Sequence, residues 1–243
     1  IPKMISPQGP DDFRPISLTN TCLKFLTKLL ANRLQKVILQ CIHKNQYGFL
    51  KSRSIQDCLA WEFEYIHQCK QSKRPIIILK MDFAKAFDTV EHEIILQVLH
   101  HKGFDSKWIA WVREILSSGT SSVLLNGILG KQFKCKCGVR QGDPLSPLLF
   151  VIVADLLQSV VNQMMAQGPL ALPIPSHDPN YPIMQYADDT IIILPAVDEQ
   201  LVARKNMLVV VMPPIKSYTN HARKRVRSRS GTHGKISQHN SKT

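Results

Sequence analysis

The stretch MQYADDTIIIL, residues 184–194, places two adjacent carboxylates, Asp188 and Asp189, between two runs rich in apolar and β-branched residues. Such runs, the second of them stopped by Pro195, predict two buried strands joined by a short turn. Ionised carboxylates are costly to bury, and two of them side by side also repel each other. The fold must therefore bring either water or a cation to the tip of this hairpin.

A third acid occupies a similar position elsewhere in the chain. Asp82 ends the short apolar run 74–83, which we interpret as a central strand. Exposure to water explains a single acid at the end of a strand, but here three such positions coincide. Since neighbouring residues of a strand point to opposite faces, Asp188 and Asp189 can converge only in a tight turn, and we place both of them there. Three converging carboxylates would need a cation such as Mg²⁺ or Mn²⁺, and two such ions stabilise in-line phosphoryl transfer.

Apolar residues recur at helical spacing in much of the chain, which predicts helices over residues 18–42, 54–69, 88–100, 108–116, 147–165 and 198–209. The second of these helices carries on one face Ile55, Leu59, Phe63 and Ile66. Asp88 and Glu91 have the spacing of a capping box for the third helix. Asn126-Gly127 between apolar flanks predicts a further hairpin. Helices and antiparallel hairpins are mixed without βαβ regularity, which is typical of the α+β class.

Charge is distributed unevenly along the chain. The 31 Lys and Arg residues outnumber the 18 Asp and Glu residues, for a net charge of +13. Eight of these cations and no acid lie from residue 213 onward, so residues 211–243 are predicted to form a basic, disordered tail. A basic protein suits a polyanionic partner such as nucleic acid. A solvated basic surface is the alternative, and charge alone does not choose between them.

The six cysteines are too sparse for a disulfide scaffold, so we expect reduced thiols and an intracellular protein, in the nucleus or the cytoplasm. Cys135 and Cys137 form a lone pair, and the sequence offers no second pair at the spacing of a zinc site. No unbroken run of about 18 apolar residues occurs, so we expect no membrane association.

Five segments, in order, resemble the ordered motifs of reverse transcriptases: FRPISL (13–18), QYGFLKSRSIQD (46–57), LKMDFAKAFDTV (79–90), GVRQGDPLSPLLF (138–150) and YADDTIIIL (186–194). Their spacing is similar to that of the non-LTR (LINE-type) retrotransposon branch, and the motif sequences are especially similar to those of plant members. The resemblance covers about residues 1–209. It implies the fingers and palm of a polymerase right hand over residues 1–210, with an antiparallel palm sheet packed by helices and the thumb missing. Residues 211–243 lie outside the family pattern.

The resemblance also implies roles for individual residues at a catalytic centre. Asp82, Asp188 and Asp189 correspond to the catalytic acids that bind two Mg²⁺ (or Mn²⁺) ions, with the backbone carbonyl of Phe83 as a further ligand. Of these acids, Asp188 is the one expected to touch both ions.

Contacts to the incoming dNTP are implied for Arg14, Lys3, Phe87, Gln141 and Gly142. Arg14 would bind the triphosphate, as a planar and always charged guanidinium suits, and Lys3 would assist unless it is a solvated loop lysine. Phe87 occupies the steric-gate position that disfavours a ribose 2′-OH, and a core aromatic is an alternative compatible with that role.

Contacts to the template and primer are implied for a further set of residues. Gly48 and Arg53 would follow the template strand. Arg140 would contact phosphate or else lie at the surface. Tyr186 would lie near the primer terminus or else in the core.

These roles imply an RNA-directed DNA polymerase that extends a DNA primer 3′-OH with dNTPs on an RNA template. A catalytically inactive nucleic-acid-binding remnant and a maturase-type protein are the alternatives. Ser52 departs from the usual glycine of its motif. Upstream finger segments and the family's lysine-bearing segment after residue 210 are not matched. We therefore expect a truncated chain with feeble or no polymerase activity and a frameshifted or run-on tail.

Overall fold

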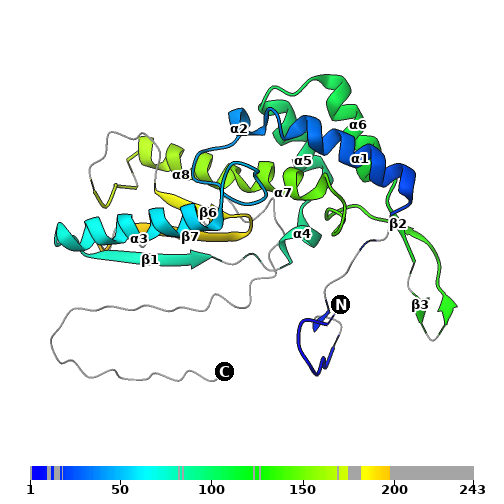
Figure 1. Ribbon diagram of the computed structural model, residues 1–243, viewed down its shortest axis with the longest axis horizontal. Coiled ribbons are helices and arrows are strands. Elements are labelled where there is room, and N and C mark those ends of the chain that lie inside the picture. The colour runs from blue at the N-terminus through cyan, green and yellow to red at the C-terminus, as the bar shows by residue number, and fades with distance from the viewer. Residues whose placement is uncertain are drawn as a thin grey trace.

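The computed structural model describes residues 2–9, 12–13, 17, 19–81, 83, 85–122, 124–125, 127–168, 170–174 and 182–197. Within these ranges the helices are α1 (Thr21–Leu34), α2 (Ile38–Cys41), α3 (Ile55–Gln71), α4 (Ala86–Thr89), α5 (His92–His101), α6 (Ser106–Ser117), α7 (Ser146–Ala154) and α8 (Leu156–Ala166). The strands are β1 (Ile76–Met81), β2 (Thr120–Ser121), β3 (Leu124–Leu125), β4 (Ile128–Leu129), β5 (Phe133–Lys134), β6 (Ile183–Tyr186) and β7 (Asp189–Pro195). The predicted α+β class is confirmed (Figure 1).

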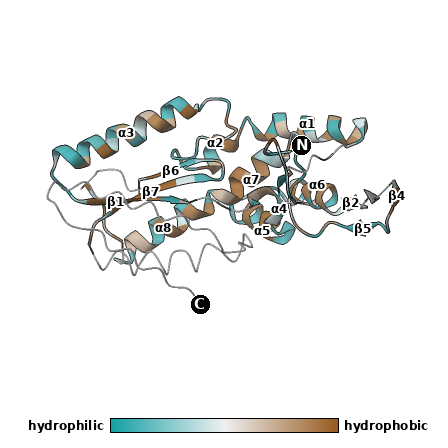
Figure 2. Ribbon diagram, turned by 90° about the horizontal axis from the view of Figure 1, so that it is seen from below, coloured by the Kyte–Doolittle hydropathy of each residue, from teal (hydrophilic) through white to brown (hydrophobic). Residues whose placement is uncertain are grey.

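The main sheet is antiparallel, with the strand order β1-β7-β6. Helix α3 covers one face of this sheet, and α7 and α8 lie on the other (Figure 2). Ile191 and Ile193 of β7 belong to the cluster under α3, whereas Ile192 and Leu194 belong to the larger core. Because successive side chains of a strand point to opposite faces, a strand covered on both faces carries an unbroken apolar run, as β7 does from Ile191 to Leu194.

Strand β1 is an edge strand of the described sheet, and the prediction of a central strand over residues 74–83 is therefore wrong. The central strand is β7, which pairs with both β1 and β6. Two side chains of β1, Ile78 and Lys80, are exposed. A short apolar run is compatible with either position, and only the strand pairing distinguishes them.

The first predicted helix, residues 18–42, is broken into α1 and α2. Helix α1 begins at Thr21 rather than at residue 18, because the side-chain oxygen of Asn20 caps it by accepting a hydrogen bond of 2.8 Å from the Leu23 N–H. The end of α1 tightens through the bond from the Val37 N–H to the Leu34 carbonyl, 3.0 Å. Beyond it the side chain of Gln35 donates to the Phe49 carbonyl at 2.9 Å, so a contact with a later loop accompanies the break.

Helix α3 begins with a capping box, in which Ser54 and Asp57 exchange hydrogen bonds between their side chains and backbones. Its apolar residues do not pack as the predicted face suggested. Leu59 is 44% exposed and Phe63 is 68% exposed. Of the predicted face, Ile66 packs in the cluster against the sheet, and the other residues on the covered side are Cys58, Tyr65 and Cys69. The helix has two apolar stripes, and the sheet covers only one.

The capping box predicted at Asp88 and Glu91 is absent. Asp88 lies inside α4, and its Oδ1 accepts a hydrogen bond of 3.0 Å from the Gln141 side chain. Helix α5 begins at His92, and within the described residues the side chain of Glu91 does not cap it. A tertiary contact has therefore replaced the local one. The hairpin predicted at Asn126-Gly127 is confirmed as β3–β4, with Gly127 at φ +82°.

The long predicted helix starts with Pro147 in the first turn of α7, as expected, but Asp155 separates α7 from α8. Among the described residues, Ser146–Ala166 is the one helical stretch long and apolar enough to cross a membrane. However, 61% of that window is buried inside the protein, and the α7 side chains Leu149, Phe150 and Ile152 are among its largest fully buried groups. The protein's own core accounts for this apolar composition.

Candidate active site

The predicted tight turn joins β6 and β7, and its two central residues are Ala187 and Asp188. The last cross-strand pair before it is Tyr186 with Asp189. Ala187 has φ +57°, whereas Asp188 is not among the described residues with positive φ. A positive φ at the first central position of a two-residue hairpin turn is a conformation that glycine adopts most easily. An alanine there costs about 1–2 kcal/mol, so its surroundings must hold the turn in place.

The two acids occupy different positions, which corrects the prediction that both lie in the turn. Asp188 is in the turn and half-buried, while Asp189 is the first residue of β7 and exposed. Asp189 Oδ1 lies 3.3 Å from Lys80 Nζ of β1, and both side chains are more than half exposed. An ion pair so exposed contributes little to stability, but it marks where the end of β1 meets the turn.

The register of β1 against β7 also places the end of β1 beside the turn. Met81, the last residue of β1, pairs with Thr190, the neighbour of Asp189. The predicted third acid, Asp82, follows Met81 in the chain and lies outside the described residues. Within the part of the chain that the structure describes, no group of three His, Cys, Asp or Glu side chains gathers in a metal-binding arrangement. Two carboxylates at a hairpin tip nevertheless match the oxygen ligands that Mg²⁺ and Mn²⁺ prefer.

The loop that holds Gln46, Gly48 and Arg53 packs against this turn. A Cβ atom added at Gly48 would lie 2.3 Å from the Ala187 nitrogen, so only glycine fits here. Gln46 is fully buried, and its Oε1 accepts hydrogen bonds of 2.9 Å from the N–H groups of Ala187 and Gly48. Sequence reasoning missed Gln46, although a polar residue beside an essential glycine in a motif was a usable signal.

Arg53 fixes the same loop rather than projecting from it. Its Nη1 donates to the carbonyl oxygens of His43 at 2.6 Å and Gln46 at 2.5 Å. Burial lowers the pKa of the Arg53 guanidinium from its ordinary value. These contacts give Arg53 and Gly48 structural roles, and the template contacts implied for them stay predictions.

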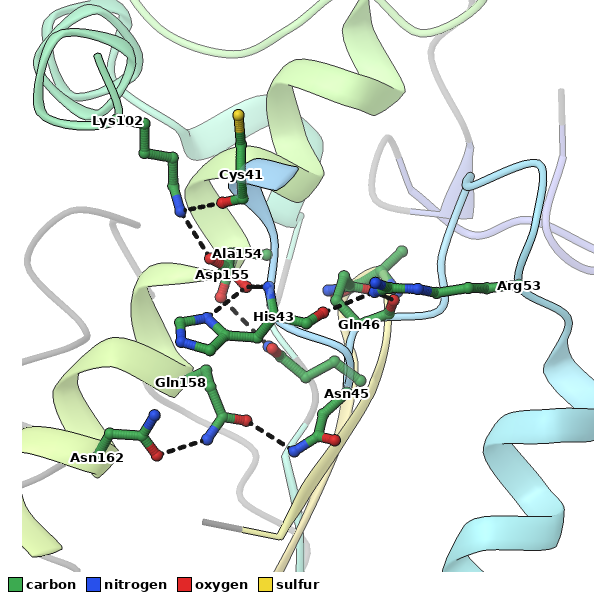
Figure 3. A network of polar contacts seen from close by, with 12 residues as sticks. Cys41, His43, Asn45, Gln46, Arg53, Lys102, Ala154, Asp155, Gln158 and Asn162 are labelled. Atoms are coloured by element: carbon green, nitrogen blue, oxygen red, sulfur yellow. Dashed lines mark hydrogen bonds and ion pairs between the residues drawn. The ribbon is translucent and has the colours of Figure 1, made fainter. Parts of the chain in front are cut away.

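A buried ionic cluster anchors the other end of the loop (Figure 3). The fully buried carboxylate of Asp155 accepts hydrogen bonds from Lys102 Nζ at 2.7 Å, the His43 N–H at 2.9 Å and His43 Nδ1 at 3.0 Å. Burial raises the pKa of this carboxyl, but the hydrogen bond from His43 and the charge of Lys102 outweigh burial and lower it overall. An acid interrupting an apolar helix was the sequence signal for this cluster.

The steric-gate candidate Phe87 is half-buried and held between two other rings. It stacks on the core residue Phe150 with ring centroids 4.6 Å apart, and the ring of Phe49 meets it edge-on at 6.1 Å. Since Phe49 follows Gly48, one loop touches both the turn and the candidate gate. The position of Phe87 is therefore compatible with both predicted roles, a steric gate and a core aromatic.

The remaining predicted residues are distributed around this loop and the N-terminal segment. Gln141 bonds to Asp88 of α4, Gly142 has φ +100°, and Arg140 Nη2 donates to Ser118 Oγ at 3.2 Å. Tyr186 is half-buried and packs in the cluster under α3. The side chain of Lys3 is exposed in a segment that folds back through a Pro2–Phe13 bridge. Arg14 lies outside the described residues.

An antiparallel sheet with helices on both faces (Figure 2) and paired acids at a hairpin tip is the arrangement expected of a polymerase palm. Among solved structures, the chain is similar to telomerase from Candida albicans in complex with the TWJ fragment of telomeric RNA, with a TM-score of 0.57 and 12% identity. That match covers 88% of this chain and 35% of the telomerase chain, and at this identity it shows the fold alone. It confirms the predicted polymerase fold class.

Sequence comparison identifies the family. Residues 1–221 match the family described as "Reverse transcriptase (RNA-dependent DNA polymerase)". The chain is 32% identical over 157 residues to the Retrovirus-related Pol polyprotein from type-2 retrotransposable element R2DM of Drosophila melanogaster. It is 28% identical over 196 residues to the polyprotein from type-1 retrotransposable element R2 of Popillia japonica. The protein belongs to the reverse transcriptase family and resembles its non-LTR retrotransposon members, which confirms the recognition made from the motifs.

The chain spans only part of these relatives. The two alignments cover 65% and 79% of this chain but 15% and 26% of the two polyproteins. The family match runs to residue 221, whereas the predicted boundary near residue 210 lies outside the described residues. That boundary and the similarity of the motifs to those of plant members stay predictions.

Proposed function

We propose that the protein is an RNA-directed DNA polymerase domain that extends a DNA primer 3′-OH with dNTPs on an RNA template. The observation that carries the proposal is the tight turn with Asp188, held against the end of β1 that leads into Asp82. Membership of the reverse transcriptase family supports it. Because the reaction needs positioning and charge stabilisation rather than a covalent intermediate, a rigid turn suits it.

The residues that would hold two Mg²⁺ (or Mn²⁺) ions are Asp82, Asp188 and Asp189, with the Phe83 carbonyl as a further ligand. When bound, such ions supply Lewis-acid stabilisation of the charge that develops on phosphate oxygens. The carboxylates themselves would transfer no proton in the proposed reaction. They would provide negative charge at a fixed position, where the ions bind. Asp189 would exchange its contact with Lys80 for this role.

Other residues would orient the nucleotide and the nucleic acid. The triphosphate would contact Arg14, assisted by Lys3, while Gln141 and Gly142 lie against the base pair being formed. Phe87, backed by the core ring of Phe150, presents an aromatic edge that excludes a 2′-OH.

The nucleic acid would contact residues around the turn and the loop. Tyr186 would support the primer terminus, and Gly48, Arg53 and Arg140 would lie along the template. We also propose an intracellular location, supported by the six cysteines, all of them among the described residues and free.

Primer extension on an RNA template with Mg²⁺ tests the proposal. The wild-type chain should extend a DNA primer, at the low rate expected of a truncated chain. Asp188→Asn should lower that rate by at least about two orders of magnitude, as the removal of one charge-stabilising group does in other enzymes. Asp105→Asn is the matched control, since it removes one acid at the N-terminus of α6 and asparagine also caps helices well.

A wild-type chain that binds the primer–template duplex without extending it, in Mg²⁺ and in Mn²⁺, would overturn the proposal. The protein would then be a nucleic-acid-binding remnant. Extension that survives Asp188→Asn would show that this turn is not the catalytic centre.

A further inference from the structure

The buried side-chain amide of Gln46 contacts both backbone polar groups of the turn residue Ala187. Its Oε1 accepts from the Ala187 N–H at 2.9 Å, and its Nε2 lies 3.4 Å from the Ala187 carbonyl oxygen, a long hydrogen bond. The same Oε1 accepts from the Gly48 N–H at 2.9 Å. Gln46 therefore joins its own loop to the turn, although 141 positions separate it from Ala187 in the chain.

Ala187 is the residue of the turn that most needs such support. It is in the left-handed region at φ +57°, where a side chain with a Cβ is disfavoured. Strained backbone persists only where the surrounding structure determines it. Asp188 follows directly, so a shift of Ala187 would move the carboxylate that the proposed function places at the metal ions.

Gln46 is itself held in place from several directions. Its carbonyl oxygen accepts from Arg53 Nη1, and its backbone forms a parallel bridge with Gln185 of β6. The neighbouring N–H of Tyr47 donates to the Gln185 carbonyl at 2.7 Å. Arg53 also bonds to the His43 carbonyl, and His43 is anchored on Asp155 (Figure 3). The amide thus reaches the turn from a fixed position.

We propose that Gln46 is a positioning residue of the active site: its amide holds the Ala187 backbone so that Asp188 is presented in one geometry. The catalytic part of this inference rests on the proposed polymerase function. The structural part, the hold on Ala187, can be tested independently of activity.

Amide hydrogen exchange of the full chain, without nucleic acid or metal, tests the hold directly. The Ala187 N–H should be protected in the wild type, because its partner is a buried side chain. Gln46→Met keeps the approximate size of the side chain but removes the acceptor, and it should speed exchange at Ala187 by about tenfold, as expected for one hydrogen bond. An unprotected Ala187 N–H in the wild type would overturn the proposal, even if the variant fails to fold.

Gln158→Met is the matched control. Gln158 is also a fully buried glutamine, and it bonds to Asn45 and Asn162 rather than to the turn. It should leave exchange at Ala187 within about twofold of the wild type. Equal acceleration in both variants would show a general loosening and would contradict a specific role for Gln46.

Steady-state primer extension tests the catalytic part. For Gln46→Met we expect kcat to fall about tenfold or more while the KM for dNTP changes less than about twofold, because positioning of Asp188 acts on the chemical step. A rise in KM with kcat unchanged would contradict this. If the wild type extends nothing, the proposed function fails, and the exchange experiment still decides whether Gln46 holds the turn.

Discussion

At the scale of single residues, the two adjacent acids are not equivalent. Asp188 sits in the turn beside a strained alanine, and Asp189 begins a strand and faces Lys80. A lysine ammonium and a metal ion would compete for the same carboxylate. A cation that binds Asp189 would therefore have to displace its contact with Lys80.

Replacing Lys80 with methionine should lower the Mg²⁺ concentration that gives half-maximal primer extension, by about two- to threefold. The change removes a competing positive charge next to Asp189, and its effect on stability should stay below about 1 kcal/mol because the pair is exposed. A Mg²⁺ titration of extension rate measures this. Lys70→Met, on the exposed end of α3, is the control, and a half-saturating concentration that stays the same or rises would contradict the interpretation.

At the scale of elements, the central relation is between the loop around Gly48 and the β6–β7 hairpin. The loop carries no regular structure of its own, yet it lies beside β6, touches the turn, and reaches Phe87 through Phe49. It connects the proposed catalytic acid to the proposed gate. Its packing is close enough that a single added carbon would disturb it.

We expect Gly48→Ala to destabilise the protein by about 1–3 kcal/mol, the usual range for overpacking in a close-packed region, and to reduce primer extension. The added Cβ would meet backbone atoms of Ala187, which cannot rotate away as a side chain can. Urea unfolding measures the loss. Gly9→Ala should be nearly neutral, since nothing lies within 4 Å of a Cβ there. Equal effects of the two changes would contradict the close contact.

At the scale of the whole molecule, Asp155 joins segments that are far apart in the sequence. It breaks the long core helix into α7 and α8 and receives hydrogen bonds from His43, 112 positions away, and from Lys102, 53 positions away. Lys102 also bonds to the Cys41 carbonyl at 2.6 Å. The loop that supports the turn is thereby tied to the core.

Asp155→Asn should lower the free energy of unfolding by about 3–5 kcal/mol near pH 6, because it leaves Lys102 largely buried without its anion. The pKa of Asp155 is lowered by folding, so its stabilisation is present above the ordinary value of 3.8 and is lost as pH falls through the folded-state pKa. The difference between variant and wild type should therefore shrink toward about pH 3. Urea unfolding at both pH values measures this.

The exposed pair of Arg113 and Glu93, 3.6 Å apart, provides the comparison. Glu93→Gln should cost less than about 1 kcal/mol. A cost for Asp155→Asn no larger than this, or a difference that grows as the pH falls, would contradict the assigned role of the buried cluster.

Much of the local structure was predictable from local pattern. Four features depend on residues within a few positions of one another: the turn after Tyr186, the β3–β4 hairpin, the cap at Asn20, and the start of α7, with Pro147 in its first turn. The motifs also identified the family and the acids of the candidate site. The roles assigned to all of the candidate site residues stay predictions, and Asp82 and Arg14 also lie outside the described residues.

The errors have one physical cause. Each wrong prediction concerns a feature that depends on partners distant in the chain. These features are the buried stripe of α3, the edge position of β1, the role of Asp88 and the helix break at Asp155. Periodicity shows that a segment has an apolar face, but not which face another element will cover, nor whether a polar side chain will find a partner. Gln46 and Ala187 meet only because folding brings a loop against a hairpin tip. The sequence by itself identified Asp188 and Asp189 as candidate site residues. Only the tertiary structure showed which contacts hold the turn that carries them, because those contacts come from a loop that is distant in the chain.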